Sequence, residues 1–243
     1  MKRILTSLAA AAALSSVTVP ALAQGKDFAT QGTFAFGVER AFGFYIGTRK
    51  TEWPLNERTN DFNRLTFLIG SSSETDLGVT EAPMPYHSPR VGFDYFVIDG
   101  LSLGGSLAAW SYDDEAQTQE QQPPDISNVD NFERSGFLIS PRVGYAIMFG
   151  DVVGIWPRGG ITYWSDSFDD QDDNLGDQDS NEFGLTLEFH LVLVPIEHVG
   201  ITVGPVLDFM FAGEVDRPNP NAQDPDLHTT SFGIAVAGMF GYI

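Results

Sequence analysis

Ionisable side chains recur within short segments of this chain whose residues alternate between large apolar types and small or polar types. The set comprises Arg90, Asp94, Arg142, Arg158, Glu188, His190 and Asp208. All seven fall on the face that otherwise carries Gly, Ala and Ser. Counted from the nearest short turn, all of them except Asp94 lie within about three residues of one height, so at ~3.3 Å per residue they would share one layer.

Arginine, carboxylate and histidine in one cavity can form either an active site or a structural network of ion pairs. His190 has no serine at a suitable spacing, and His87, His198 and His228 lie at strand ends or in loops. We therefore favour the structural network over catalysis. A buried arginine without a partner is very costly, so the three arginines are expected to pair with Glu188, Asp208 or Asp94, and Glu39 is a further candidate.

The acidic stretch at 166–182 is the second candidate for chemistry. Its residues Asp170, Asp172, Asn174, Gly176 and Glu182 follow the order of a calcium-binding loop, with Leu175 inserted. The insertion and the expected strand context argue against a true calcium-binding hand. We favour a solvated acidic loop, with weak calcium binding as the alternative, and no other cofactor is expected.

The elements that position these residues are predicted to be β-strands, because the alternation has period two. We expect eight strands, at 33–47, 89–98, 101–112, 136–148, 152–164, 182–194, 199–212 and 231–243. In the last of these, Phe232, Ile234, Val236, Phe240 and Tyr242 are predicted to share the apolar face. The segment 62–70 also alternates, and pairing within 71–88 would raise the count to ten.

Two residue types on these faces need explanation. Arg40 falls on the apolar face of the first strand, which indicates a bulge, a snorkelling side chain or a wrong register. The sequence SPRVG occurs at 88–92 and again at 140–144. The alternation predicts that Pro89, Pro141 and Pro157 face outward at local bends, with the neighbouring arginines inward.

The connections between these strands fall into two alternating length classes. Short turns are predicted at Asp99-Gly100, as a type I′ turn, at Gly150-Asp151 and at Glu197-His198. Long acidic loops are predicted at 113–133, 166–180 and 213–229. Short turns at one end and long polar loops at the other are typical of transmembrane barrels in the bacterial outer membrane.

On this pattern, residues 31–243 resemble the small outer-membrane β-barrel proteins whose best known members have eight strands. The resemblance implies a closed antiparallel transmembrane β-barrel, inserted by the barrel-assembly machinery and surrounded by membrane lipid and lipopolysaccharide. The terminal strand of such proteins usually ends in an aromatic residue, whereas here Ile243 is last and Tyr242 precedes it. Some barrels of this membrane are lipid-modifying enzymes with a catalytic His near the rim.

The ends and the composition agree with an exported protein. Residues 1–23 read as a signal peptide, with Lys2 and Arg3 ahead of an apolar run and cleavage before Gln24, which leaves 24–243 as the barrel domain. The formal net charge of −20 excludes nucleic-acid binding through phosphate neutralisation. The chain contains no cysteine, so disulfides do not support the fold.

A secreted β-sandwich or a soluble lipid-binding barrel would also alternate, but its polar face would meet water. The small, weakly charged opposite face here suits the inside of a narrow barrel, so we favour the membrane barrel. We expect a non-enzymatic monomer with an occluded, charged lumen and a structural or surface-interaction role. The alternatives are a small porin and, more distantly, a lipid-modifying enzyme.

Overall fold

The computed structural model describes residues 27–54, 56–67, 88–117, 129–170, 178–216 and 225–243. The predicted signal peptide and His87 lie outside these residues, as do Asp172 and Asn174. No helix in the described ranges has the length and apolar character needed to cross a membrane.

The described chain is built of β-strands that run antiparallel to their neighbours. They are β1 (Phe34–Glu39), β2 (Phe42–Trp53), β3 (Asn56–Phe67), β4 (Arg90–Ile98), β5 (Leu101–Gln117), β6 (Val129–Tyr145), β7 (Ile147–Met148), β8 (Val153–Asp170), β9 (Gln178–Ile196), β10 (Val199–Asp216) and β11 (Asp226–Tyr242).

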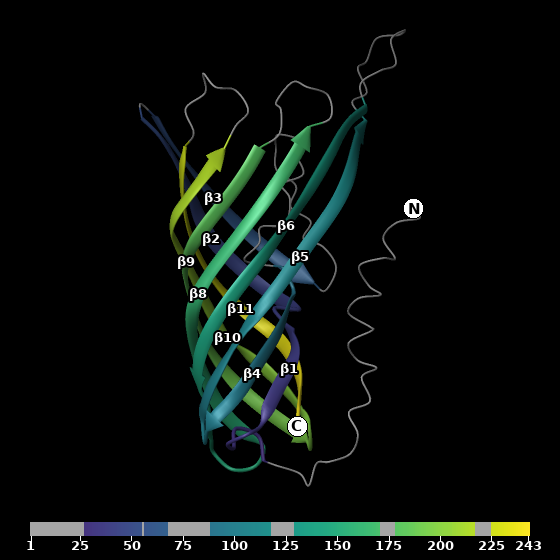
Figure 1. Ribbon diagram of the computed structural model, residues 1–243, viewed down its shortest axis with the longest axis vertical. Coiled ribbons are helices and arrows are strands. Elements are labelled where there is room, and N and C mark those ends of the chain that lie inside the picture. The colour runs from purple at the N-terminus through teal and green to yellow at the C-terminus, as the bar shows by residue number, and fades with distance from the viewer. Residues whose placement is uncertain (1–26, 55, 68–87, 118–128, 171–177, 217–224) are drawn as a thin grey trace.

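Eight of these strands close into a ring, which confirms the predicted barrel and its strand number. The order around the ring is β1-β4-β5-β6-β8-β9-β10-β11, and β1 also pairs with β11. Figure 1 shows the tilted strands as a tall barrel, with the short turns at its lower end, called the turn end, and the opposite loop end above.

Residues 62–67 of the predicted segment 62–70 form part of β3, which does not raise the ring above eight strands, and 68–70 lie outside the described residues. β2 continues the line of β1 along β11, and β3 pairs with β2. β3 and β4 therefore occupy the same place in the wall, with β3 toward the loop end and β4 toward the turn end. Within the described residues no ladder joins β3 to β5.

Arg40 lies at the break between β1 and β2, and of the three explanations the bulge is correct. Its backbone has a φ of 53°, in the left-handed region that residues other than glycine rarely adopt. The two residues of the break, Arg40 and Ala41, interrupt the ladder without changing the parity of the strand. As a result the Arg40 side chain points into the lumen, where it is 2% exposed.

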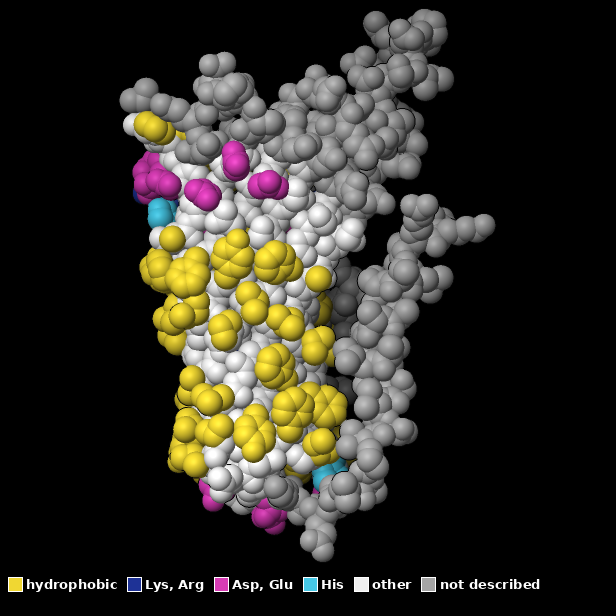
Figure 2. Space-filling model, viewed as in Figure 1, with side chains coloured by type: hydrophobic (Ala, Val, Ile, Leu, Met, Phe, Trp, Pro, Cys, Tyr) yellow, Lys and Arg dark blue, Asp and Glu magenta, His cyan; other side chains and the backbone are white. Residues whose placement is uncertain are grey.

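The alternation sends large apolar side chains outward around the barrel. Leu185, Leu187, Phe189 and Leu191 are between 39% and 50% exposed, whereas their neighbours on β9 are buried. Figure 2 shows such side chains as a band around the visible face, with acidic side chains beyond it at both ends. A closed barrel with this band is a membrane-spanning barrel, so the soluble alternative is wrong.

The predicted faces of the last strand are wrong near its end. The register of β10 and β11 passes from Val203↔Val236 to Thr202↔Gly238, which leaves Ala237 as an extra residue in a bulge. One extra residue inverts the alternation beyond it. Phe240 and Tyr242, predicted to face outward, therefore lie in the lumen, where they are 8% and 4% exposed.

Several predicted boundaries are also wrong. Only Gly100 of the first turn has a positive φ, of 81°, so this is not a type I′ turn, which needs two such residues. The turn predicted at Gly150-Asp151 spans 149–152 between β7 and β8. The strands also run on into all three predicted long loops, because ladder hydrogen bonds do not require apolar side chains.

The outward band predicts a depth-dependent cost for charge. Leu187→Arg places a cation on the lipid face within the band and should destabilise the barrel by about 2–4 kcal/mol. Ser167→Arg, outward on β8 but beyond the band, should change stability by no more than about 1 kcal/mol. Denaturant unfolding in lipid vesicles measures both, and equal effects would contradict the assigned register.

Candidate functional site: the lumenal ion-pair network

Four arginines and four carboxylates lie together in the middle of the lumen, and we call them the ion-pair network. Its members are Arg40, Arg90, Arg142, Arg158, Glu39, Asp94, Glu188 and Asp208. Each is at most 8% exposed. The structure thus places all seven sequence-predicted residues in the lumen, His190 included, together with the further candidate Glu39, and adds Arg40 to them. Their formal charges balance, as the burial of ions requires.

Arg142 of β6 makes the most symmetrical contact of the network. Its two terminal nitrogens each donate to one oxygen of Glu39, both at 2.6 Å. The same guanidinium donates to Asp94 and lies 3.7 Å from Glu188. A bidentate arginine–carboxylate contact fixes orientation as well as distance. Arg142 therefore joins β6 to β1 and β4 across the lumen.

Arg158 of β8 connects Glu39 with Glu188. It lies 2.7 Å from Glu39 and 2.7 Å from Glu188. Its guanidinium also lies 4.7 Å from the ring centre of Trp156. His190 Nδ1 is 2.9 Å from an Arg158 nitrogen. Because arginine only donates, this contact requires that Nδ1 carries no proton. His190 is therefore a hydrogen-bond acceptor whose Nδ1 is already engaged by Arg158.

Arg40 forms the other half of the network with Asp208 of β10. Its nitrogens lie 2.7 and 3.0 Å from the Asp208 oxygens and 3.4 Å from Glu188. Sequence reasoning missed this role, because strict alternation placed Arg40 on the lipid face. The sequence did contain a signal for this role. A lone arginine among phenylalanines that face outward indicates that the backbone changes direction at that residue. Arg90 lies across the ladder from Glu39 and is 2% exposed.

A chain of hydroxyl groups runs around the wall into this network. Ser140 and Thr162 are 2.8 Å apart, and Thr162 and Thr186 are 2.6 Å apart. Thr186 donates to Asp208 at 2.7 Å. Because Thr186 donates its only hydroxyl proton to the carboxylate, it must accept a hydrogen bond from Thr162, which in turn accepts one from Ser140. Each hydroxyl dipole in the chain therefore points toward the negative charge of Asp208.

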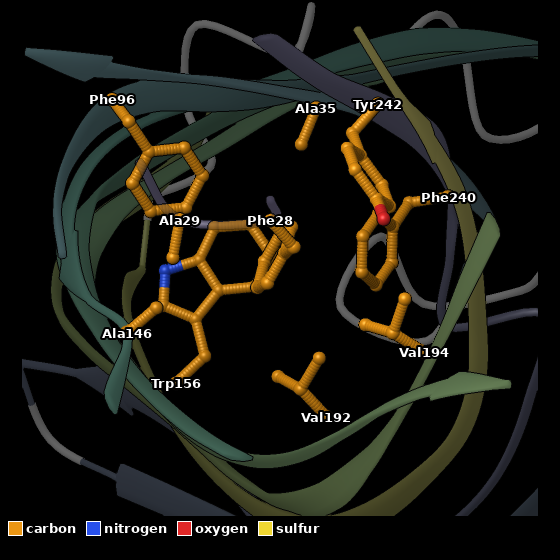
Figure 3. Packing of buried hydrophobic residues seen from close by; sticks show 10 residues of the cluster. All are labelled: Phe28, Ala29, Ala35, Phe96, Ala146, Trp156, Val192, Val194, Phe240 and Tyr242. Atoms are coloured by element: carbon orange, nitrogen blue, oxygen red, sulfur yellow. The ribbon is translucent and has the colours of Figure 1, made fainter. Parts of the chain in front are cut away.

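Apolar clusters fill the lumen on both sides of the network. Toward the turn end, Phe28, Phe96, Trp156, Phe240 and Tyr242 form an aromatic cluster with smaller residues, shown in Figure 3. Toward the loop end lies a second cluster, which comprises Phe62, Leu138, Trp164 and Met210 with Ala108 and Trp110. A cavity between Trp156, Glu39 and Asp94 measures about 10 Å³, about the space of one water molecule.

Of the calcium candidates, only Asp170 and Glu182 lie within the described residues. Glu182 is 0% exposed and faces the lumen, where its carboxylate accepts from Trp164 at 3.2 Å and from Thr229 at 2.8 Å. Asp170 ends β8. Among the described residues no group of three or more acidic or histidine side chains is placed to hold a metal ion. Weak calcium binding by the loop stays a prediction.

Neither a family model nor a curated protein matches this sequence. Solved structures of outer-membrane proteins do match. Ail, the attachment invasion locus protein of Yersinia pestis, is 10% identical with a TM-score of 0.37 and covers 88% of this chain and 99% of its own. The outer membrane protein AlkL in lipid bilayers is 12% identical with a TM-score of 0.46, over 93% of this chain and 95% of its own.

The outer membrane protease OmpT of Escherichia coli is also similar, at 7% identity and a TM-score of 0.43, over 89% of this chain and 97% of its own. The fold assignment rests on the strand ladders of the chain itself. A closed barrel with an outward apolar band is a protein of the bacterial outer membrane, so lipid and lipopolysaccharide surround it.

The arrangement can hold the barrel together, because its ion pairs join strands across the lumen. Buried ion pairs are strong when complete and costly when one partner is lost. Arg142→Ala should therefore destabilise the barrel by about 3–5 kcal/mol, because Glu39 and Asp94 lose their closest partner. The outward neighbour Val143, 50% exposed, should tolerate alanine within about 1 kcal/mol.

Denaturant unfolding in lipid vesicles compares the two variants. If Arg142→Ala prevents folding, Glu39→Gln with Arg142→Gln removes one charge of each sign, so the formal charges of the network still balance. This double variant should fold and lie closer to the unsubstituted protein. Equal stability of the Arg142 and Val143 alanine variants would contradict the network.

Proposed function

We propose that this protein is a structural or surface-interaction barrel of the outer membrane whose lumen does not conduct. The observation that supports the proposal most is the continuous filling of the lumen: an aromatic cluster, the charge-balanced network and a second apolar cluster follow one another along the axis. An eight-stranded barrel has an interior just wide enough for side chains to fill.

Its place of interaction is the loop end. Most ring strands have 17–19 residues, well above the ~9–11 needed to span the membrane. The strands thus carry polar positions such as Ser135, Ser167 and Asp179 outward beyond the band. The acidic sequence there would meet ions, lipopolysaccharide or neighbouring surfaces. Because the ring closes within one chain, we propose a monomer, inserted by the barrel-assembly machinery.

A catalytic role is not part of this proposal. His190 lies within the lumen with Nδ1 bonded to Arg158, away from lipid. His198 sits at the turn end, where Nδ1 contacts the Tyr242 carbonyl oxygen at 2.9 Å. His228 faces outward on β11 opposite Lys50, which pairs with Glu52 and Glu57 at 2.6 and 3.0 Å. None of these histidines contacts a serine or cysteine nucleophile among the interactions of the described residues.

One observation favours a second candidate, the passage of small solutes. Phe62 of β3 and Trp110 of β5 both belong to the second apolar cluster, and within the described residues no ladder joins these two strands. A small apolar molecule that left between the two strands at this level would avoid the charged network below. Passage would then run sideways, not along the axis.

The main proposal predicts that purified protein in planar bilayers gives no stable conductance steps. The reason is that ions would have to displace paired charges and two apolar layers. The unsubstituted protein is the test sample, and a known open porin in the same lipid is the control. Large, long-lived open steps would contradict occlusion and favour the porin alternative.

The second candidate predicts uptake of an apolar fluorescent probe by vesicles with lipopolysaccharide in the outer leaflet. Uptake should exceed that of protein-free vesicles and should fall with Phe62→Asp, which places a charge in the apolar cluster. Ser167→Asp, outward beyond the band, is the matched control. Equal uptake with and without protein would contradict sideways passage.

A further inference from the structure

The chain enters the lumen before its first strand begins. Residues Asp27–Thr33, here called the N-terminal strap, precede β1 at the turn end of the barrel. Within the strap, Phe28 and Ala29 are 5% and 7% exposed. Figure 3 shows both inside the ring of strands, between Phe96 and Trp156 on one side and Phe240 and Tyr242 on the other.

Phe28 is the centre of the aromatic cluster. Its ring centre lies 5.0 Å from that of Phe240, 5.3 Å from Phe96 and 5.4 Å from Trp156. A fourth contact, to Tyr242, measures 5.5 Å. These partners come from β4, β8 and β11, which surround the lumen. One side chain of the strap therefore closes the space that the wall strands leave open.

The strap is held by a few bonds outside the ladders of the ring. The Gly32 amide donates to the Phe96 carbonyl at 2.8 Å, and the Phe96 amide donates to Thr33 at 2.9 Å. The Gly100 amide donates to the Ala29 carbonyl at 2.8 Å. The Gln31 amide donates to the Asp99 carboxylate at 2.8 Å.

The wall at this level closes without the strap. β1 pairs with β4 on one side and with β11 on the other. The Phe34 and Ile243 backbones also exchange two hydrogen bonds, of 2.8 and 3.0 Å. Departure of the strap would thus remove Phe28 and Ala29 from the turn end but leave its wall intact.

The aromatic cluster and the network meet at Ser102. Trp156 of the aromatic cluster donates to the Ser102 hydroxyl at 3.2 Å, and that hydroxyl contacts Asp94 at 3.5 Å. Ser102 therefore lies between the two layers. Thr162, in the hydroxyl chain that leads to Asp208, follows Arg158 along β8 toward the loop end.

We propose that the N-terminal strap is a separate, displaceable closure of the turn end, which keeps periplasmic water from the ion-pair network. The network remains closed when the strap leaves, because none of its pairs involves strap residues. The predicted cleavage before Gln24 would leave three residues ahead of Asp27, so the strap would be tethered only through β1. This inference rests on the proposed occluded lumen and assigns it two closures in series.

Thiol labelling tests the proposal, since the chain contains no cysteine of its own. Ser102→Cys reports the space behind the strap, and Thr162→Cys reports the far side of the network. Each reporter is combined with Phe28→Ala, and a small, charged, membrane-impermeant thiosulfonate reagent is added to protein in lipid vesicles. Asp99→Ala, which removes the anchor of Gln31 without touching the cluster, is a milder second variant.

We expect Phe28→Ala to raise the labelling rate at position 102 by about tenfold or more, with position 162 changed by less than about twofold. Asp99→Ala should act in the same direction but less. An equal rise at both positions would overturn the proposal, because the whole barrel would then have loosened. No rise at position 102 in either folded variant, as judged by heat-dependent gel mobility, would also overturn it.

Conductance of the same proteins tests the proposed occlusion of the lumen separately from the role of the strap. Open steps from the unsubstituted protein would overturn the proposed occlusion and leave the strap to be judged by the labelling. If the strap and the network are closures in series, Phe28→Ala alone stays silent. Steps from Phe28→Ala alone would show that the network does not close the lumen, contrary to the proposal.

Discussion

The structure depends on one electrostatic constraint: charges taken out of water must be paired where they lie. Eight ionised side chains share the middle of this lumen, and four positive charges meet four negative ones. Arg142 and Arg158 both hold Glu39 on β1, while Arg40 holds Asp208 on β10. These contacts reach across the barrel rather than along its wall, so they set the strand positions relative to one another in a way that ladder hydrogen bonds do not.

The same constraint explains the irregular wall. Arg40 reaches Asp208 only because the backbone turns at the break between β1 and β2, with a φ of 53°. A left-handed residue with a side chain is unfavourable, and the buried ion pair offsets that strain. Beyond the break β2 goes on toward the loop end and takes β3 as its partner, while β1 below keeps β4. The break thus coincides with the change of neighbour in the wall.

The lumen takes the place of the hydrophobic core in this protein, because lipid covers the outside of the barrel. Its layers differ in chemistry and in origin. The aromatic cluster depends on Phe28, which precedes the first strand of the ring. The network depends on side chains of six strands. The second cluster depends on Phe62 of β3, a strand that does not belong to the eight-strand ring. Layers that arise from different parts of the chain can respond separately, which is why the ends of this barrel need not open or close together.

The sequence by itself determined the strand pattern, because the outward position of apolar side chains at every second residue follows from strand geometry. It placed Arg90, Arg142, Arg158, Glu188 and Asp208 in the lumen for that reason. It failed at Arg40, where a turned backbone sends a single side chain inward, and at Ala237, whose extra residue inverts the alternation and sends Phe240 and Tyr242 inward. Only the tertiary structure decided those positions, together with the pairing of each arginine and the entry of Phe28, since a bulge is selected by partners on distant strands and not by its own residues.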